Sequence, residues 1–238
     1  MVGVLASWPV AAGPAVIVGV VGSLATWSSA SGAILRSLGA RRGDESRWPR
    51  PFGIVEGLCA TMGLSVPELW VVDDPAADAL VVGTSPARAA LVLTTGLLDL
   101  LDPVQLEAVL AHELSHVKSG DVAVGTVAAA LALPVAGMGG AADLVHRIRG
   151  HGAELLTDRR AVGVTRYPPA LSAALVAMAA TIDAPPKAGA LPAGVRATAA
   201  GRATGWLWTV ALGPSPTGDA LVGELDVPEV RIAALDEL

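Results

Sequence analysis

The sequence contains a single cysteine, Cys59, among its 238 residues, so it cannot form an internal disulfide. A fold that depends on internal disulfides is therefore excluded. Cys59 lies in an apolar helical pattern and is predicted to be a core residue. The lack of disulfides suits a domain that folds in a reducing compartment.

Charged residues are also sparse, at 16% of the chain against 53% hydrophobic residues. This balance is more apolar than that of ordinary soluble domains and predicts that part of the chain meets lipid. Basic residues are outnumbered, with 16 Lys and Arg against 22 Asp and Glu, for a net charge of -6. Nucleic acid is therefore excluded as a partner of the whole molecule.

No basic residue precedes the first apolar run, residues 9–26, which carries no charge and lies between Trp8 and Trp27. A helix of this length spans about 30 Å, the thickness of the hydrocarbon core of a bilayer. Five arginines follow it: Arg36, Arg41, Arg42, Arg47 and Arg50. We predict a membrane anchor over residues 1–30, a basic juxtamembrane linker over 31–50, and a domain over 51–238 that faces the cytoplasm.

A cleaved signal peptide is the alternative for this N-terminal run. The small residues of the stretch 29–33 would suit a cleavage site. Signal peptides, however, normally begin with basic residues, which the stretch 1–7 lacks.

Periodicity and turn residues predict a mostly helical domain with a small sheet. At 238 residues the chain has room for one catalytic-sized domain, and it shows no internal repeats. The predicted elements are a helix Pro51–Met62 ended by Gly63, a strand Glu68–Val72, a hairpin of Ala79–Gly83 with Ala90–Thr94, a short helix Leu97–Leu101, a helix from Pro103 to about Lys118 capped by Asp102, and a helix Leu171–Ile182. Residues 184–195 are predicted to be a loop.

The predicted helix after Asp102 contains the motif His112-Glu113-Leu114-Ser115-His116. Residues four apart share a helix face, so both imidazoles can reach one zinc ion. Glu113 is one step round the helix, where it can act as general base on a zinc-activated water. A chance match on an ordinary helix is the competing interpretation.

A catalytic zinc needs a third protein ligand, and the downstream candidates are His146, His151 and Glu154. Glu154 and Asp158 are four apart and share a helix face. Asp158 could then accept a hydrogen bond from a ligating histidine and fix its tautomer. The alternative for Asp158 is a solvated salt bridge to Arg159 or Arg160.

A second uncharged run, residues 122–142, is long enough to cross a bilayer but contains Pro134 and Gly139-Gly140. A single crossing would separate His116 from Glu154 by the membrane, so these two could not share a metal. The run is predicted to be a core helix, a re-entrant element or a surface-lying segment. The later Trp206-Leu207-Trp208 suggests either a membrane-facing or substrate-facing patch or a half-buried strand.

Residues 50–238 resemble the Ste24/HtpX-type family of membrane-associated zinc endopeptidases, most specifically over residues 90–121. The resemblance implies that Glu154, in an E-x-x-x-D element with Asp158, is the third ligand in place of His151. It also implies that the strand from Ala79 pairs with substrate backbone; the substrate-strand residues are Asp78, Ala79, Leu80 and Val81. The closing segment, residues 227–235, is similar to the last helix of the family with its Arg-Ile pair.

The chain departs from the family pattern at three places. Asp78-Ala79 replaces a common Asn-Ala, and Asp226-Val227-Pro228 replaces a common His-Pro-Pro. The interval from His116 to Glu154 is too short for the two additional crossings of HtpX-type members. His151 lies one turn before Glu154 and is a candidate transition-state stabiliser, the alternative being an exposed residue at a helix start.

The expected fold is α+β: a mostly helical, zincin-like (gluzincin) metallopeptidase domain with a small sheet, preceded by one transmembrane helix. The expected function is that of a zinc endopeptidase with one Zn²⁺ per chain, a polypeptide substrate and membrane lipid as a partner of the N-terminal helix. Two alternatives are a processing peptidase dedicated to one partner or precursor, and a non-catalytic membrane scaffold that contains zinc. The retention of Glu113 argues against the scaffold, because a structural zinc site needs no base.

Overall fold

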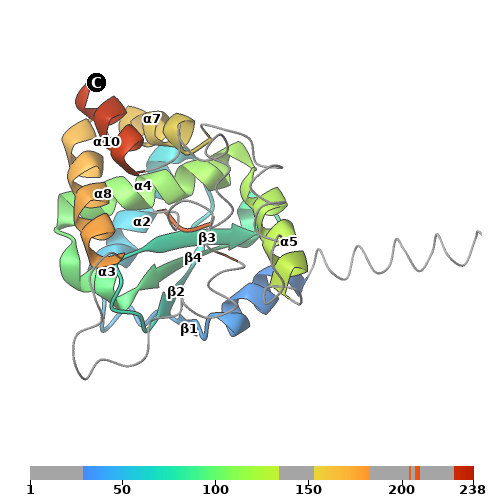
Figure 1. The fold of residues 1–238 in the computed structure, drawn as a ribbon. Coiled ribbons are helices and arrows are strands. Elements are labelled where there is room, and N and C mark those ends of the chain that lie inside the picture. The colour runs from blue at the N-terminus through green and yellow to red at the C-terminus, as the bar shows by residue number, and fades with distance from the viewer. Residues whose placement is uncertain (1–28, 134–152, 183–203, 205–206, 210–227) are drawn as a thin grey trace, which may run out of the picture.

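A four-stranded sheet lies at the centre of the part of the chain that the computed structural model describes, residues 29–133, 153–182, 204, 207–209 and 228–238 (Figure 1). The strands are β1 (Arg41–Arg42), β2 (Glu68–Val72), β3 (Ala79–Gly83) and β4 (Ala89–Thr94), in the order β1-β2-β4-β3. β2 and β4 are parallel, and the two outer pairs are antiparallel. This order leaves β3 at one edge.

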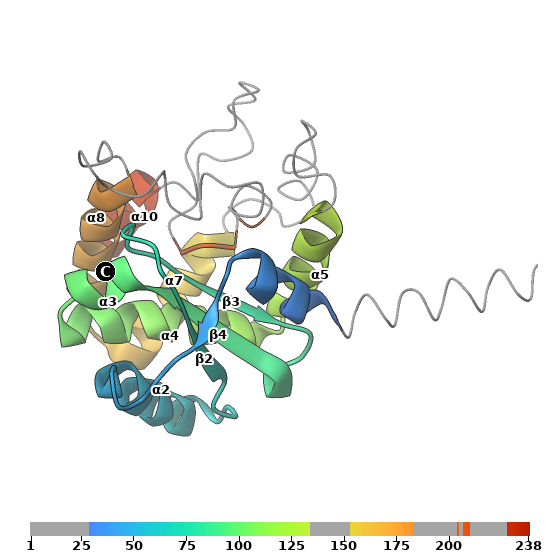
Figure 2. The same cartoon turned by 90° about the horizontal axis from the view of Figure 1, so that it is seen from below.

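Both faces of the sheet are covered, because successive side chains of a strand point to opposite faces. Val81, Leu91 and Leu93 pack with α2 (Pro49–Met62), α4 (Pro103–Ser119) and α8 (Pro168–Ile182). Leu80, Val82 and Val92 pack on the other side with residues 29–38, α5 (Val122–Ala132) and Trp208. Figure 2 shows these two layers on either side of the strands. The continuous apolar runs of β3 and β4 reflect this burial on both faces.

The two ends of the central helix α4 are set by its capping residues, Asp102 and Gly120. The Asp102 carboxylate accepts hydrogen bonds from the backbone N–H groups of Val104 and Gln105, and the Gln105 side chain accepts one from the Asp102 N–H. Gly120 ends the helix with φ of 79°, a left-handed conformation that glycine adopts readily. Residues 108–117 of α4 are buried throughout.

The turn Thr94-Thr95-Gly96 fixes the start of β3 beside α3 (Thr95–Leu100). The Thr94 hydroxyl accepts hydrogen bonds from the N–H groups of Asp78 and Leu97, at 2.9 and 3.1 Å. Gly96 packs so closely that a Cβ there would lie 2.1 Å from the Pro75 carbonyl oxygen. This turn sets the position of the edge strand relative to α3.

The short helix η1 (Pro86–Arg88) joins β3 to β4. Two further helices from the second half of the chain complete the described fold: α7 (Ala153–Thr165) lies along α4, and α10 (Pro228–Asp236) packs on α7 and α8 (Figure 1). Segments far apart in the sequence are thereby brought to the same side of α4.

The predicted α+β architecture and the predicted strands are confirmed; β2 and β3 have the predicted limits, and β4 begins one residue earlier. The predicted anchor, residues 9–26, and the predicted loop, residues 184–195, lie outside the described residues. Among the helices that the structure describes, none is long and apolar enough to cross a membrane.

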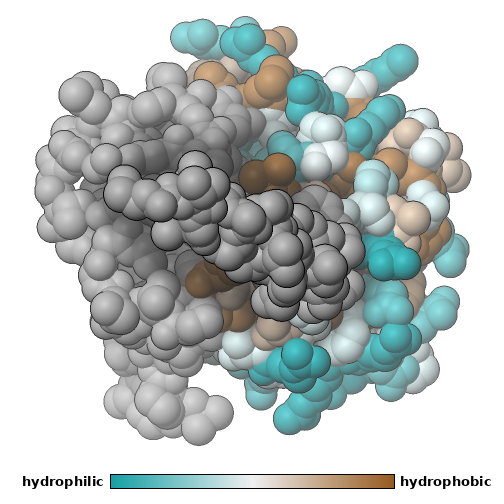
Figure 3. All heavy atoms as spheres, turned by 90° about the vertical axis from the view of Figure 1, so that its right-hand side faces the viewer, coloured by the Kyte–Doolittle hydropathy of each residue, from teal (hydrophilic) through white to brown (hydrophobic). Residues whose placement is uncertain are grey.

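The described half of the apolar run 122–142 forms α5. It contacts β3 through buried Thr126 and Ala129, while Val124 and Leu131 are 58% and 61% exposed. The described part is thus a helix with one face on the sheet and the other face uncovered by the described residues. Figure 3 views the molecule from the side on which α5 lies, where both hydrophobic and hydrophilic side chains reach the surface.

Candidate metal centre

Two histidines on one face of α4 begin the site. His112 and His116 are one helical turn apart, and their ring centroids lie 5.0 Å apart with the planes at 82°. Their exposed fractions are 0% and 6%. The motif therefore places two imidazoles side by side in the interior of the domain.

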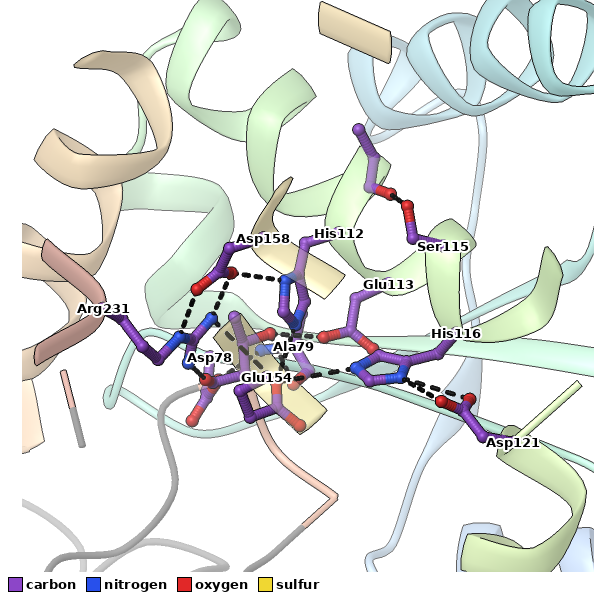
Figure 4. A network of polar contacts seen from close by, with 12 residues as sticks. Asp78, Ala79, His112, Glu113, Ser115, His116, Asp121, Glu154, Asp158 and Arg231 are labelled. Atoms are coloured by element: carbon purple, nitrogen blue, oxygen red, sulfur yellow. Dashed lines mark hydrogen bonds and ion pairs between the residues drawn. The ribbon is translucent and has the colours of Figure 1, made fainter. Parts of the chain in front are cut away.

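Helix α7 brings Glu154 to the same place (Figure 4). Its Oε2 atom lies 3.0 Å from Nε2 of His112 and 3.6 Å from Nε2 of His116. Ligand atoms about 2.1 Å from a tetrahedral ion lie about 3.4 Å from one another, so this spacing fits one zinc ion. Within the described residues, these three are the group of possible metal ligands that the structure brings together.

The other nitrogen of each imidazole faces a carboxylate. Nδ1 of His112 lies 2.8 Å from Oδ1 of Asp158, and Nδ1 of His116 lies 3.2 Å from Oδ1 of Asp121. A proton on each Nδ1, donated to its carboxylate, would leave the lone pair of each Nε2 for a metal ion. The spacing of the three ligand atoms and these carboxylate partners therefore both fit a metal.

Asp158 itself is held by Arg231 of α10 and not by Arg159 or Arg160, the alternative partners in the sequence. The Arg231 guanidinium donates two hydrogen bonds of 2.7 Å to the two Asp158 oxygens. Burial raises the pKa of Asp158, but the charge and hydrogen bonds of Arg231, together with the hydrogen bond from His112, outweigh it and hold that pKa below its usual value. Asp158 thus stays ionised beside His112.

The electrostatics of His112 favour a bound cation. Burial lowers the pKa of His112, but its contacts with Asp158 and Glu154 outweigh burial and raise that pKa above its ordinary value. A metal on Nε2 would take the place of a proton there.

Glu113 is buried beside the two histidines, with an exposed fraction of 1%. Its Oε1 atom accepts a hydrogen bond of 2.5 Å from the hydroxyl of Thr209. Burial raises the pKa of Glu113, against the opposing effects of the histidines and Thr209. A carboxylate with a raised pKa is better matched to accept a proton near neutral pH.

Three residues of this site were not assigned to it from the sequence: Asp121, Thr209 and Arg231. Asp121 follows Gly120, the C-cap of α4, so its position near His116 could have been inferred from the helix end. The sequence places Arg231 in the Arg-Ile pair of the closing helix but does not predict its contact with Asp158. Nothing in the local sequence of Thr209 signals its contact with Glu113.

The predicted substrate strand lies at the edge of the sheet, beside α4. The Asp78 side chain accepts a hydrogen bond of 2.8 Å from the N–H of Ala79. The Ala79 carbonyl accepts one of 2.9 Å from the N–H of Thr209, and Leu80 forms an isolated antiparallel bridge with Trp208. Part of this edge is thus already paired within the chain.

Two other predictions from the sequence concern the Trp206-Leu207-Trp208 segment and His151. Trp208 is 1% exposed, so it belongs to the core and does not form a surface patch. His151, the candidate transition-state stabiliser, and Trp206 lie outside the described residues.

Comparison with known proteins finds relatives from several bacteria that have the same name. The chain is 43% identical to a protein named "Protease HtpX homolog" from Dictyoglomus thermophilum, over 41% of this chain and 32% of the relative. A protein of the same name from Tropheryma whipplei is 43% identical over 48% of this chain and 38% of the relative. One from Streptococcus pneumoniae is 33% identical over 54% of this chain and 43% of the relative.

The chain thus spans less than half the length of each of these relatives. No solved structure matches it. The sequence profile described as peptidase family M48 matches residues 53–183, which contain α4, both histidines and Glu154. The resemblance to HtpX/Ste24-type proteins is confirmed, and the chain belongs to peptidase family M48.

Proposed function

We propose that the chain is a zinc-dependent endopeptidase of the HtpX/Ste24 type. The observation that carries the proposal is the convergence of His112, His116 and Glu154 in a buried place with Glu113 beside them. Two imidazoles and one carboxylate are a donor set that suits zinc and leaves one coordination position open.

Each residue has a separate proposed role. His112, His116 and Glu154 hold the ion, while Asp158 orients His112. When bound, zinc would lower the pKa of a water molecule to near neutrality and polarise the peptide carbonyl. Glu113 takes the proton from that water and passes it to the leaving amine.

A polypeptide substrate would bind in extended form along the outer edge of β3, over Asp78, Ala79, Leu80 and Val81. The isolated antiparallel bridge of Leu80 with Trp208 supports this proposal, since the outer side of β3 there pairs with another segment of backbone. At the Ala79 end, a substrate would lie next to the segment of Thr209, whose N–H donates to the Ala79 carbonyl.

One narrower question concerns how many substrates the proposed enzyme has. A peptidase dedicated to one partner and a peptidase that degrades many proteins would have the same site. Comparison of the proteome with and without active enzyme separates them, because the first leaves one changed partner and the second many.

Membrane attachment is also a proposal, supported by the uncharged run 9–26 and the arginines that follow it. It places the catalytic domain on the cytoplasmic side. Retention of the full chain in membranes after alkaline carbonate washing is the expected result, and its release into the wash would contradict the anchor.

The experiment that tests the catalytic proposal is casein cleavage by the purified full chain, before and after treatment with a chelator. Cleavage that the chelator stops and stoichiometric Zn²⁺ restores is the expected result. Cleavage that is insensitive to the chelator would refute a metal-dependent mechanism.

A further inference from the structure

Thr209 reaches the proposed general base from a distant part of the chain. Its exposed fraction is 1%, and its hydroxyl lies 2.5 Å from Oε1 of Glu113, 96 positions away in the sequence. Nothing in the zinc-binding motif requires such a contact.

The hydroxyl proton of Thr209 has two acceptors within reach. Its oxygen lies 3.1 Å from the Ala79 carbonyl oxygen and 2.5 Å from the Glu113 carboxylate. The Ala79 oxygen already accepts the Thr209 N–H at 2.9 Å, whereas an ionised carboxylate is the stronger acceptor. The hydroxyl proton is therefore assigned to Glu113.

The two oxygens of Glu113 are thereby made unequal. Oε1 is held by Thr209, while Oε2 is buried and has no hydrogen-bond partner among the described residues. A buried carboxylate oxygen without a partner is costly unless a ligand or water satisfies it. Oε2 is the oxygen left to receive a proton from the water of the reaction.

Thr209 is itself held firmly on three sides. Its carbonyl oxygen accepts a hydrogen bond from Arg231, which also binds Asp158. Its N–H donates to Ala79, and the neighbouring Trp208 is buried and bridges to Leu80. The hydroxyl is thus placed by backbone and core contacts that do not depend on Glu113.

We propose that Thr209 is a positioning residue for the reaction: it fixes the Glu113 carboxylate so that Oε2 faces the reacting water. This inference rests on the proposed function. It predicts that Thr209 acts through Glu113 and contributes little to metal binding, because Thr209 touches none of the three proposed ligands in the described hydrogen bonds.

Two variants of the full chain separate this role from simple packing. Thr209→Val has nearly the same shape but no hydroxyl, and Thr209→Ser keeps the hydroxyl but loses the methyl group. We expect Thr209→Val to lower kcat for casein-derived peptide by about 10- to 100-fold with little change in KM or zinc content. Thr209→Ser should stay within about threefold of the wild type, since it keeps the donor.

A second readout does not depend on turnover. A small peptide hydroxamate would bind the zinc and donate a hydrogen bond to Glu113, and its affinity is measured by calorimetry. Thr209→Val should weaken hydroxamate binding by about tenfold in the wild-type background and leave it nearly unchanged in the Glu113→Gln background. Such non-additivity is the expected result if Thr209 acts through Glu113.

Three results would overturn the positioning role. The first is a kcat of Thr209→Val equal to that of the wild type, and the second is a kcat of Thr209→Ser as low as that of Thr209→Val. The third is a loss of hydroxamate affinity in Thr209→Val that is the same with and without Glu113→Gln. In those cases the wild type still binds zinc and cleaves, so the proposed function stands. A wild type that binds neither zinc nor hydroxamate would overturn both.

Discussion

Arg231 of α10 binds both oxygens of Asp158 on α7, at 2.7 Å each, across 73 residues of sequence. Both residues are buried, with exposed fractions of 0%. Asp158 in turn contacts Nδ1 of His112 at 2.8 Å. The last helix of the chain is therefore joined through one carboxylate to a proposed zinc ligand.

Asp158→Asn would remove the anionic group that accepts two hydrogen bonds from the buried Arg231 guanidinium. Loss of one partner of a buried ion pair typically costs about 3–5 kcal/mol of unfolding free energy. Zinc affinity should also fall by about 10- to 100-fold, because His112 loses its ionised partner. Urea unfolding and competition with a zinc chelator measure the two effects.

Asp99→Asn is the matched control for this substitution, because Asp99 is exposed at the end of α3. Its unfolding free energy should differ from the wild type by no more than about 0.5 kcal/mol. If Asp158→Asn and Asp99→Asn had the same unfolding free energy, the Asp158–Arg231 pair would not contribute to the stability of the fold.

Glu113→Gln should keep its zinc and lose its activity. The amide cannot accept the proton of the water, so the rate of casein cleavage should fall by at least about 10²–10⁴-fold. Zinc content, measured by elemental analysis, should be unchanged because Glu113 is not one of the three proposed ligands. Glu107→Gln, the same change at an exposed position of α4, should behave as the wild type.

Glu154→Ala should reduce zinc occupancy, since it removes one of the three proposed ligands. Two imidazoles alone leave the ion without the anionic ligand that the site provides. Glu56→Ala, on the exposed side of α2, is the control and should bind zinc normally. Full occupancy and activity in Glu154→Ala would assign the third ligand to another residue, with His146 and His151 as the first to examine.

Gly96→Ala should destabilise the fold that positions the edge strand. The new Cβ would lie 2.1 Å from the Pro75 carbonyl oxygen, so the backbone must shift, at a cost of about 1–3 kcal/mol. Gly57→Ala is the opposite case, since it lies in α2 with open space around it and should gain about 0.5–1 kcal/mol. Urea unfolding of both variants tests this; a stable Gly96→Ala would contradict the close contact.

The sequence predicted the parts of the site that lie within one helix or one turn. His112, Glu113 and His116 are related by the helix period, and Asp102-Pro103 marks the start of their helix. The boundaries of β2 and β3 followed from apolar runs between turn residues. Such signals depend only on neighbours in the chain.

Thr209 and Arg231 could not be predicted in this way. Their contacts with Glu113 and Asp158 depend on how α7, α10 and the segment of Thr209 pack around α4, and no local period encodes that packing. The choice of Glu154 over His151 needed the family resemblance, because both residues precede Asp158 within two helical turns.

The central claim is that His112, His116 and Glu154 bind one zinc ion. X-ray absorption at the zinc edge of the purified full chain tests it most directly. The expected spectrum has about four nitrogen and oxygen ligands at about 2.0–2.2 Å, of which two are imidazoles, and no sulfur ligand at about 2.3 Å. A spectrum with a sulfur ligand or without two imidazoles, or a chain that retains no zinc, would contradict the claim.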